Sequence, residues 1–233
     1  MDALSLREKE IFEALRELRG LEFVVIGGYA VGAYALPRFS VDCDVVVKNE
    51  ETAGKIRERL GKRGYSVTAA SRTATSYQGS YVRLEKVLEN KFRASFDLLV
   101  GGVLDRRTAA AFPAEWVFAH SSKRRLKGKT VQEALELRVI GVDALAAMKL
   151  VASRKTDLRD VFMLLPALED FGEVRKMVAE KTDVKEAVAR ARRLIISKEF
   201  RKNLGGVYGH VDENTYQKHL NAFERFDGAG TKR

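Results

Sequence analysis

The 233-residue chain is long enough for one large or two modest domains, and its 45% hydrophobic and 32% charged residues exclude wholesale disorder. Its 42 lysines and arginines against 32 acidic residues give a net charge of +10, which favours a polyanionic partner. A single cysteine excludes an intrachain disulfide, and no apolar run approaches the ~20 residues of a membrane span. With no signal-peptide pattern at the start, we expect a cytoplasmic protein without membrane contact.

The first part of the sequence predicts alternating helices and strands. Apolar residues at helical spacing predict a helix over 4–19, which ends at Gly20. A β-branched strand over 21–26 then ends at Gly27-Gly28, and a short helix over 29–36 is stopped by a proline. Further strands are expected at 41–47, 65–70, 79–88 and 92–101, with a helix at 51–64.

From about Val131 the pattern becomes helical. The expected helices cover 131–154, 156–172, 173–181 and 183–204, the first containing a short strand near 136–140. The candidate N-caps are Asp143, Thr156 or Asp157, and Thr182 or Asp183. The tail after Gly205 is polar and is expected to be loose and frayed at its end. The predicted fold is therefore α+β: a small mixed sheet with flanking helices over 1–130, and a helical region over 131–233.

Two aspartates lie in an apolar strand. In "SVDCDVVV" strand alternation places Asp42 and Asp44 on one face, roughly 6–7 Å apart along the strand, and Cys43 on the other. Asp97 stands in a second apolar strand, so pairing of the two strands would gather three carboxylates. Such a cluster favours Mg²⁺, which carboxylates hold together with substrate phosphates. The alternative is a pair of exposed acids, or acids paired with nearby Arg38 and Lys48.

A double glycine precedes the acidic strand. Gly27-Gly28 ends a strand and leads into a helix, and such a turn lets a phosphate approach the backbone. The pattern of Ile26-Gly27-Gly28, 13 residues and then Asp42-x-Asp44 resembles the signature of the polymerase-beta-type nucleotidyltransferase superfamily.

Further residues fit that resemblance. Asp97 stands where the superfamily has its third carboxylate, on a later strand. The sequence "RFSVDCD" resembles the basic-x-Ser/Thr lead-in of the minimal members, which implies that Arg38 and Ser40 contact phosphate or sugar. They could equally be ordinary loop residues.

The helical part resembles the AbiEii-type toxin branch. There a helical lysine precedes a basic turn and an aspartate, and "DALAAMKLVASRKTDLRD" supplies these as Lys149, Arg154, Lys155, Asp157 and Asp160. The resemblance implies that Lys149 binds the nucleotide, whereas its apolar helix also suits a lysine that extends its amine to solvent. We expect Asp160 to cap the helix or to pair with Arg154 or the neighbouring arginine.

Together these resemblances imply a magnesium- or manganese-dependent nucleotidyltransferase. An acceptor hydroxyl would attack the α-phosphate of an NTP such as ATP, with two ions held by Asp42, Asp44 and Asp97, and Asp97 is also a candidate general base. The implied role is a toxin of a toxin–antitoxin pair, with an antitoxin as protein partner and RNA, specifically tRNA, as acceptor. Basic runs at 122–129 and 189–202 favour RNA. The alternatives are an inactive nucleotide- or partner-binding module of the same fold, and transfer to a small molecule or a protein.

Overall fold

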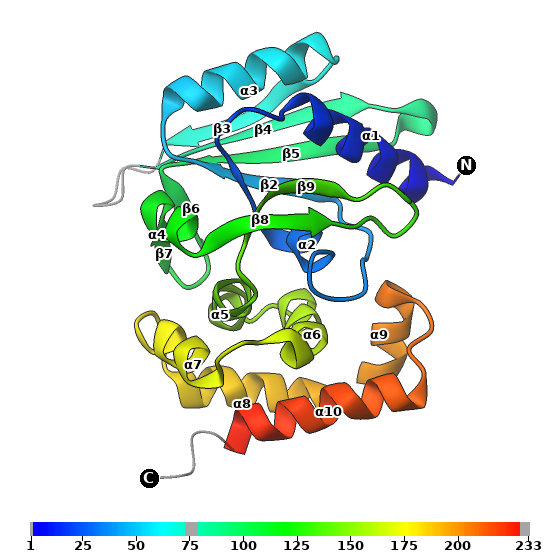
Figure 1. The fold of residues 1–233 in the computed structure, drawn as a ribbon, viewed down its shortest axis with the longest axis vertical. Helices are drawn as coiled ribbons and strands as arrows, with labels where there is room; N and C mark the ends of the chain where they lie inside the picture. Colours follow the sequence, from blue (N-terminus) through cyan, green and yellow to red (C-terminus); the bar gives the residue numbers. More distant parts are fainter. Residues whose placement is uncertain (1, 73–78, 229–233) are drawn as a thin grey trace. The chain divides into compact units, whose positions relative to one another are not determined.

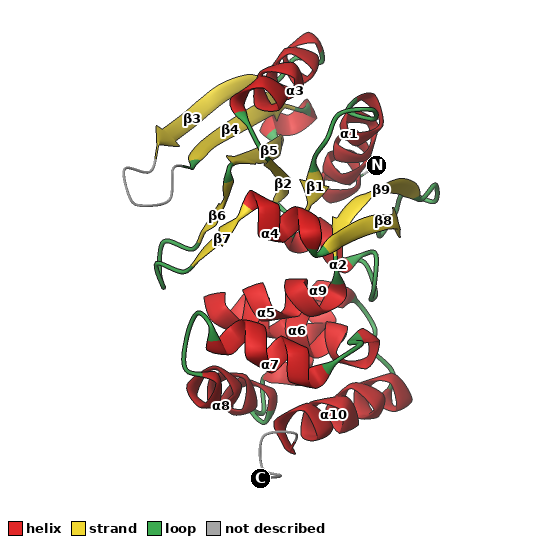
Figure 2. Cartoon of the chain, turned by 60° about the vertical axis from the view of Figure 1, so that its left-hand side comes forward, coloured by secondary structure: helices red, strands yellow, loops and turns green. Residues whose placement is uncertain are grey.

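The computed structural model describes residues 2–72 and 79–228 (Figure 1). The chain divides into two compact units. The first unit contains Met1–Ala33, Pro37–Leu104 and Ala111–Ile140. The second contains Tyr34–Leu36, Asp105–Ala110 and Gly141–Arg233. Every strand of the described residues belongs to the first unit, as the yellow arrows of Figure 2 show.

The first unit is built on a mixed sheet in the order β3-β4-β5-β2-β1-β9-β8. Its strands are β1 (Val24–Val25), β2 (Asp42–Val47), β3 (Ser66–Arg72), β4 (Ser80–Val87), β5 (Arg93–Val100), β8 (Ser121–Leu126) and β9 (Leu135–Ile140). The β2–β5 and β1–β9 pairs are parallel, and the other neighbours are antiparallel. The predicted mixed sheet is confirmed.

Helices and one hairpin complete the first unit. They are α1 (Ala3–Glu17), α2 (Gly27–Val31), α3 (Glu50–Lys62), the 3-10 turn η1 (Glu89–Lys91), β6 (Gly102–Leu104), β7 (Ala111–Pro113) and α4 (Ala114–Ala119). Side chains fix the starts of the two long helices, because Asp2 accepts from the first backbone N–H groups of α1 and Asn49 does the same for α3. Helices α1 and α3 both contact β5.

The central strands have one apolar face and one acidic face. Cys43 on β2 lies opposite Phe96 on β5, both fully buried, and the Phe96 ring meets the edge of Tyr65 at 5.5 Å. The residues next along each strand, Asp44 and Asp97, point to the other face. The apolar face thus packs in the core, and the acidic face carries Asp44 and Asp97 side by side.

The second unit is helical. Its elements are α5 (Val142–Ala152), α6 (Lys155–Leu164), the 3-10 turn η2 (Leu165–Ala167), α7 (Phe171–Ala179), α8 (Val184–Ile195), α9 (Phe200–Tyr208) and α10 (Glu213–Gly228). Helix α5 is buried on nearly every side and contacts α6, α7 and α8, so it forms the centre of this unit. No helix in the described part of the chain is long and apolar enough to cross a membrane.

Several segments differ from the sequence-based expectation. The short strand expected near 136–140 is confirmed as β9 (Leu135–Ile140), but it belongs to the sheet of the first unit, so the helical unit begins at Gly141. The expected helix over 183–204 is divided into α8 and the start of α9. The polar tail is not loose: α9 and α10 form there because apolar residues such as Leu204 and Phe223 are buried. The predicted frayed end, 229–233, lies outside the described residues.

The predicted caps have mixed outcomes. Asp183 caps α8, as predicted. The prediction of Thr156 or Asp157 as the cap of α6 was wrong, because the N-cap is Arg154 and Asp157 lies inside the first turn, where it accepts from the backbone N–H of Arg154. Asp143 does not cap α5. Its carboxylate instead accepts from the backbone N–H groups of Glu169 and Asp170, because it points towards the segment before α7.

Candidate functional site

Three carboxylates lie on one face of the central strands. Asp44 on β2 is directly opposite Asp97 on β5. Asp42 lies two residues before Asp44 on the same strand and therefore points to the same face of the sheet. Asp97 is only 8% exposed, whereas the other two are partly exposed. The sequence left open whether these strands pair. The parallel register shows that they do, with the acids in neighbouring positions.

An arginine from a third strand lies among these acids. Arg83 on β4 is directly opposite Asp97, and its Nε and Nη2 donate to the two Asp97 oxygens at 2.7 Å each. The same Nη2 reaches Asp42 Oδ2 at 3.1 Å, so the guanidinium bridges carboxylates on two strands. The Tyr81 hydroxyl also donates to Asp97 Oδ1, at 3.1 Å.

Burial and charge act on the acidity of this cluster. Burial, followed by the negative charge of Asp97, raises the pKa of Asp42 above its usual range, although the Arg83 guanidinium opposes this. Burial and the charge of Asp97 likewise raise the pKa of Tyr81. The carboxylates of Asp42 and Asp97 therefore lie close together, and the Arg83 guanidinium compensates their negative charge.

The double glycine lies directly against the acids. Gly27 has a left-handed φ of +66°, and a Cβ built there would lie 2.0 Å from Oδ2 of Asp44. A Cβ on Gly28 would lie 2.3 Å from Ser40 Oγ and 2.9 Å from Arg38 Nη2. The position of Gly27 therefore requires glycine, and a side chain at Gly28 would displace Ser40 and Arg38. The turn thus lies beside Asp44, Ser40 and Arg38.

The donor set has the chemistry of a magnesium site. Carboxylate oxygens are the ligands that hard divalent cations prefer, and Asp42 and Asp44 are partly exposed beside a turn that accommodates close approach. Both oxygens of Asp97, however, are engaged by Arg83. In the described residues no three Asp, Glu, His or Cys side chains converge as a ready-made cation site.

Of the two cations in the alternative interpretation, Arg38 lies near the acids, and its charge opposes the rise in the pKa of Asp42 that burial causes. Lys48 lies over the Phe118 ring, 4.8 Å from its centroid, and Arg38 Nη1 donates to the carbonyl of Phe39. The arginine that forms ion pairs with both Asp42 and Asp97 is Arg83.

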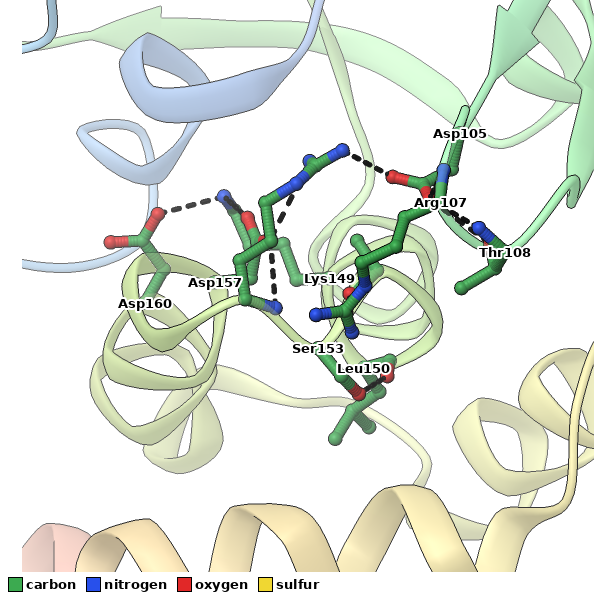
Figure 3. A network of polar contacts seen from close by, with 10 residues as sticks. Asp105, Arg107, Thr108, Lys149, Leu150, Ser153, Asp157 and Asp160 are labelled. Atoms are coloured by element: carbon green, nitrogen blue, oxygen red, sulfur yellow. Dashed lines mark hydrogen bonds and ion pairs between the residues drawn. The ribbon is translucent and has the colours of Figure 1, made fainter.

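A second polar cluster occupies the helical unit (Figure 3). Lys149 on α5 is 6% exposed, and its Nζ lies 2.7 Å from Asp160 Oδ2 and 3.3 Å from Asp157 Oδ1, both on α6. The Tyr208 hydroxyl donates to Asp160 Oδ1 at 2.5 Å. The reading of Lys149 as a lysine extended to solvent was wrong, since two buried carboxylates compensate its charge. Asp160 was expected to pair with an arginine, but it forms an ion pair with this lysine.

Arg154 connects the cluster to the segment 105–110. Its Nη2 lies 2.5 Å from Asp105 Oδ2, and its Nη1 lies 3.7 Å from Asp157 Oδ2. Asp105 Oδ1 accepts from the backbone N–H groups of Arg107 and Thr108, the residues labelled beside it in Figure 3. The basic turn of the predicted motif is thus held by two acids.

Comparison with known families now adds to this geometry. The family model described as "Nucleotidyl transferase AbiEii toxin, Type IV TA system" matches residues 11–229. The chain belongs to the AbiEii nucleotidyltransferase toxin family. This family membership agrees with the predicted resemblance and extends it through both units.

Solved structures share the fold of this AbiEii-family chain. A protein from H. pylori, assigned as a nucleotidyltransferase, aligns over 100% of this chain and 99% of its own, with a TM-score of 0.54 and 14% identity. MenT4, a nucleotidyltransferase toxin from Mycobacterium tuberculosis H37Rv, aligns over 99% of this chain and 85% of its own, with a TM-score of 0.53 and 17% identity. No curated protein sequence matches the chain.

Sequence reasoning missed the arginine of this AbiEii-family site. Alternation along "SYVRLEKV" places Tyr81 and Arg83 on one face of a strand, which is a signal that the sequence contains. What it lacks is the register that sets β4 beside β5 and Arg83 opposite Asp97. Lys149, predicted to bind nucleotide, lies in the helical unit, and that role stays a prediction.

Proposed function

We propose that this nucleotidyltransferase toxin moves an NMP from an NTP to a hydroxyl of RNA, with tRNA as the expected acceptor, and that Mg²⁺ or Mn²⁺ is required. The observation that carries the proposal is the contact between the glycine turn and the acids. A Cβ at Gly27 would overlap the Asp44 carboxylate, so this backbone and this acid are built to lie together. A turn without side chains beside paired acids suits a triphosphate and its cation.

The residues of the first unit have separate roles in this proposal. Asp42 and Asp44 would hold the cation, with Asp97 as third ligand, and the cation when bound would stabilise charge on the attacking and leaving oxygens. The glycine turn leaves room for phosphate oxygens, and Arg38 and Ser40 beside Gly28 are placed to donate to phosphate or sugar. Asp97 is also the candidate base for the acceptor hydroxyl.

Exposed basic residues support an RNA acceptor. Strand β8 is an edge strand, and Lys123, Arg124 and Arg125 on it are exposed. On α8 Arg192 and Arg193 are exposed, and Arg192 pairs with Asp227. Basic side chains on a surface can follow a phosphate backbone without reading its sequence. The type IV toxin family also suggests an antitoxin protein as a further partner.

The test is a transfer assay with radiolabelled NTPs. The purified protein is incubated with each of the four NTPs and total RNA, in Mg²⁺, in Mn²⁺ and in EDTA. We expect label on RNA in the presence of either cation and none in EDTA. Asp44→Asn serves as the inactive control. Label on a small molecule or on protein with RNA untouched would reject the RNA acceptor, and nucleotide binding without any incorporation would favour an inactive binding module.

A further inference from the structure

Arg83 occupies the position at which an acidic cluster of this kind needs a cation. Three carboxylates on one sheet face repel each other unless positive charge is near. The guanidinium lies in the row formed by Asp44, Asp97 and Arg83 itself across β2, β5 and β4. It donates to both oxygens of Asp97 and to one oxygen of Asp42.

Arg83 and Asp97 form a bidentate ion pair. The planar fork of arginine matches a carboxylate in two parallel hydrogen bonds, which a lysine ammonium cannot reproduce. Tyr81, two residues before Arg83, donates to the same Asp97 oxygen and fixes the carboxylate in place. The acid is 8% exposed and its partner is a direct neighbour in the strand register. Both oxygens of Asp97 are therefore engaged by protein donors.

A divalent cation and Arg83 would compete for the same oxygens. A metal ion bound to Asp97 would place two cationic centres against one carboxylate, and their repulsion is large in a partly buried site. We infer that Arg83 is the resident counter-ion of the three acids, and that binding of a divalent cation to Asp97 displaces its guanidinium. Arg83 is thus a positioning residue that keeps the acids together without metal and weakens metal binding.

The inference rests on the metal dependence of the proposed function. Its consequence is that the site is half-filled only at a higher concentration of divalent cation. The protein would require more divalent cation to fill the site than the acids alone would require. The side chain of Arg83 is about one third exposed, at 32%, so it has a route out of the cluster when the cation enters. The competing explanation is a purely structural ion pair, with the cation held by Asp42 and Asp44 alone.

Mn²⁺ binding distinguishes the two explanations. Calorimetric titration of metal-free protein with Mn²⁺ alone, at fixed pH and ionic strength, compares the wild type with Arg83→Gln and Arg83→Lys. We expect Arg83→Gln to bind Mn²⁺ about tenfold or more tightly, because one adjacent positive charge and its hydrogen bonds are removed. Arg83→Lys keeps the charge but loses the two parallel hydrogen bonds, so we expect a smaller increase in Mn²⁺ affinity. This variant replaces Arg83→Gln in the comparison if Arg83→Gln does not fold.

The matched control is Arg93→Gln. Arg93 lies on β5 four residues before Asp97, roughly 13 Å along the strand, and pairs with Glu85 on β4. The Arg93→Gln change removes the same charge from the same pair of strands, and we expect its Mn²⁺ affinity to stay within about twofold of that of the wild type. Melting in EDTA gives a second reading: Arg83→Gln should melt lower than wild type without metal and should gain more from Mn²⁺.

Two outcomes would overturn the inference. Mn²⁺ affinity in Arg83→Gln and Arg83→Lys that equals or falls below that of the wild type would show that the ion pair is only structural. Absence of Mn²⁺ binding in every protein would reject this inference, whereas the metal dependence of transfer is tested by EDTA in the transfer assay. If affinity rises as expected while no label reaches RNA, the inference stands and the proposed acceptor fails.

Discussion

Asp44 and Asp97 are directly opposite each other on two parallel strands, and they differ in their partners. Asp97 accepts both hydrogen bonds of the Arg83 fork, whereas Asp44 lies against the backbone of Gly27. The two acids therefore have different structural roles within one proposed site. Substitutions at the two positions should separate stability from catalysis.

Asp97→Asn and Asp44→Asn should both abolish transfer and should differ in stability. The Asp97 change removes a charge-assisted pair from Arg83, so we expect a loss of roughly 1.5–3 kcal/mol of unfolding free energy. Asp44→Asn should cost less, since the fork remains intact. Urea unfolding in EDTA and the transfer assay give the two readings. Equal destabilisation by both changes would contradict this division of roles.

Gly27→Ala should damage the site through sterics. The Cβ would overlap the Asp44 carboxylate, and φ of +66° is strained for alanine. We expect transfer to fall at least about 100-fold and stability to fall by roughly 1–3 kcal/mol. Gly61→Ala is the control, because Gly61 is exposed on α3 and has no atom within 4 Å of an added Cβ. That change should stabilise the helix by about 0.5–1 kcal/mol with transfer unchanged.

Asp42 should make stability depend on pH in the absence of metal. Burial and the charge of Asp97 raise its pKa in the folded state, so the folded protein holds this proton more tightly than the unfolded chain. The contribution of Asp42 to stability is then present at low pH and is lost as pH rises from the unfolded pKa through the folded one. Asp42→Asn cannot ionise, so its unfolding free energy should rise relative to that of the wild type as pH increases above the usual pKa of an aspartate. A difference in unfolding free energy that stays constant as pH rises would refute the prediction.

Lys149→Met should destabilise the helical unit. The change removes the lysine that pairs with the buried carboxylate of Asp160 and one of the two cations that pair with Asp157, which costs about 3–5 kcal/mol. The double variant Lys149→Met/Asp160→Asn should recover part of this loss, with a coupling energy above about 1 kcal/mol in a double-mutant cycle. Lys155→Met is the control, since Lys155 is exposed at the start of α6 and should stay within about 0.5 kcal/mol. Additive effects of the two changes would exclude the ion pair as the cause.

The exposed arginines should control RNA affinity through salt. The combined change of the β8 and α8 arginines to glutamine alters Arg124, Arg125, Arg192 and Arg193. We expect the log–log slope of RNA affinity against salt to flatten and the KM for RNA to rise, while nucleotide binding is unchanged. A control with Lys55 and Lys62 on α3 changed to Gln leaves the slope as in wild type, since both pair with glutamates of their own helix. An unchanged slope in the arginine variant would direct the search to another acceptor.

Local sequence predicted most of the elements and the acids of the proposed site. Strand alternation in "SVDCDVVV" put the two acids on one face, and the spacing to Gly27-Gly28 indicated a turn beside them. These features are readable because side-chain direction and glycine geometry depend on neighbouring residues alone. The same holds for the cap at Asp183, which acts within one helical turn.

The tertiary structure decided the partners of the charged residues. Arg83 meets Asp97 only because β4 and β5 pair in one register, and a shift by one residue would turn the arginine to the other face. Lys149 is buried because α5 lies at the centre of its unit, where two acids of α6 can reach it. Charge pairing of this kind depends on how separate strands and helices pack against each other, which no local pattern encodes. The sequence therefore specified the acids, and packing specified the cations that compensate them.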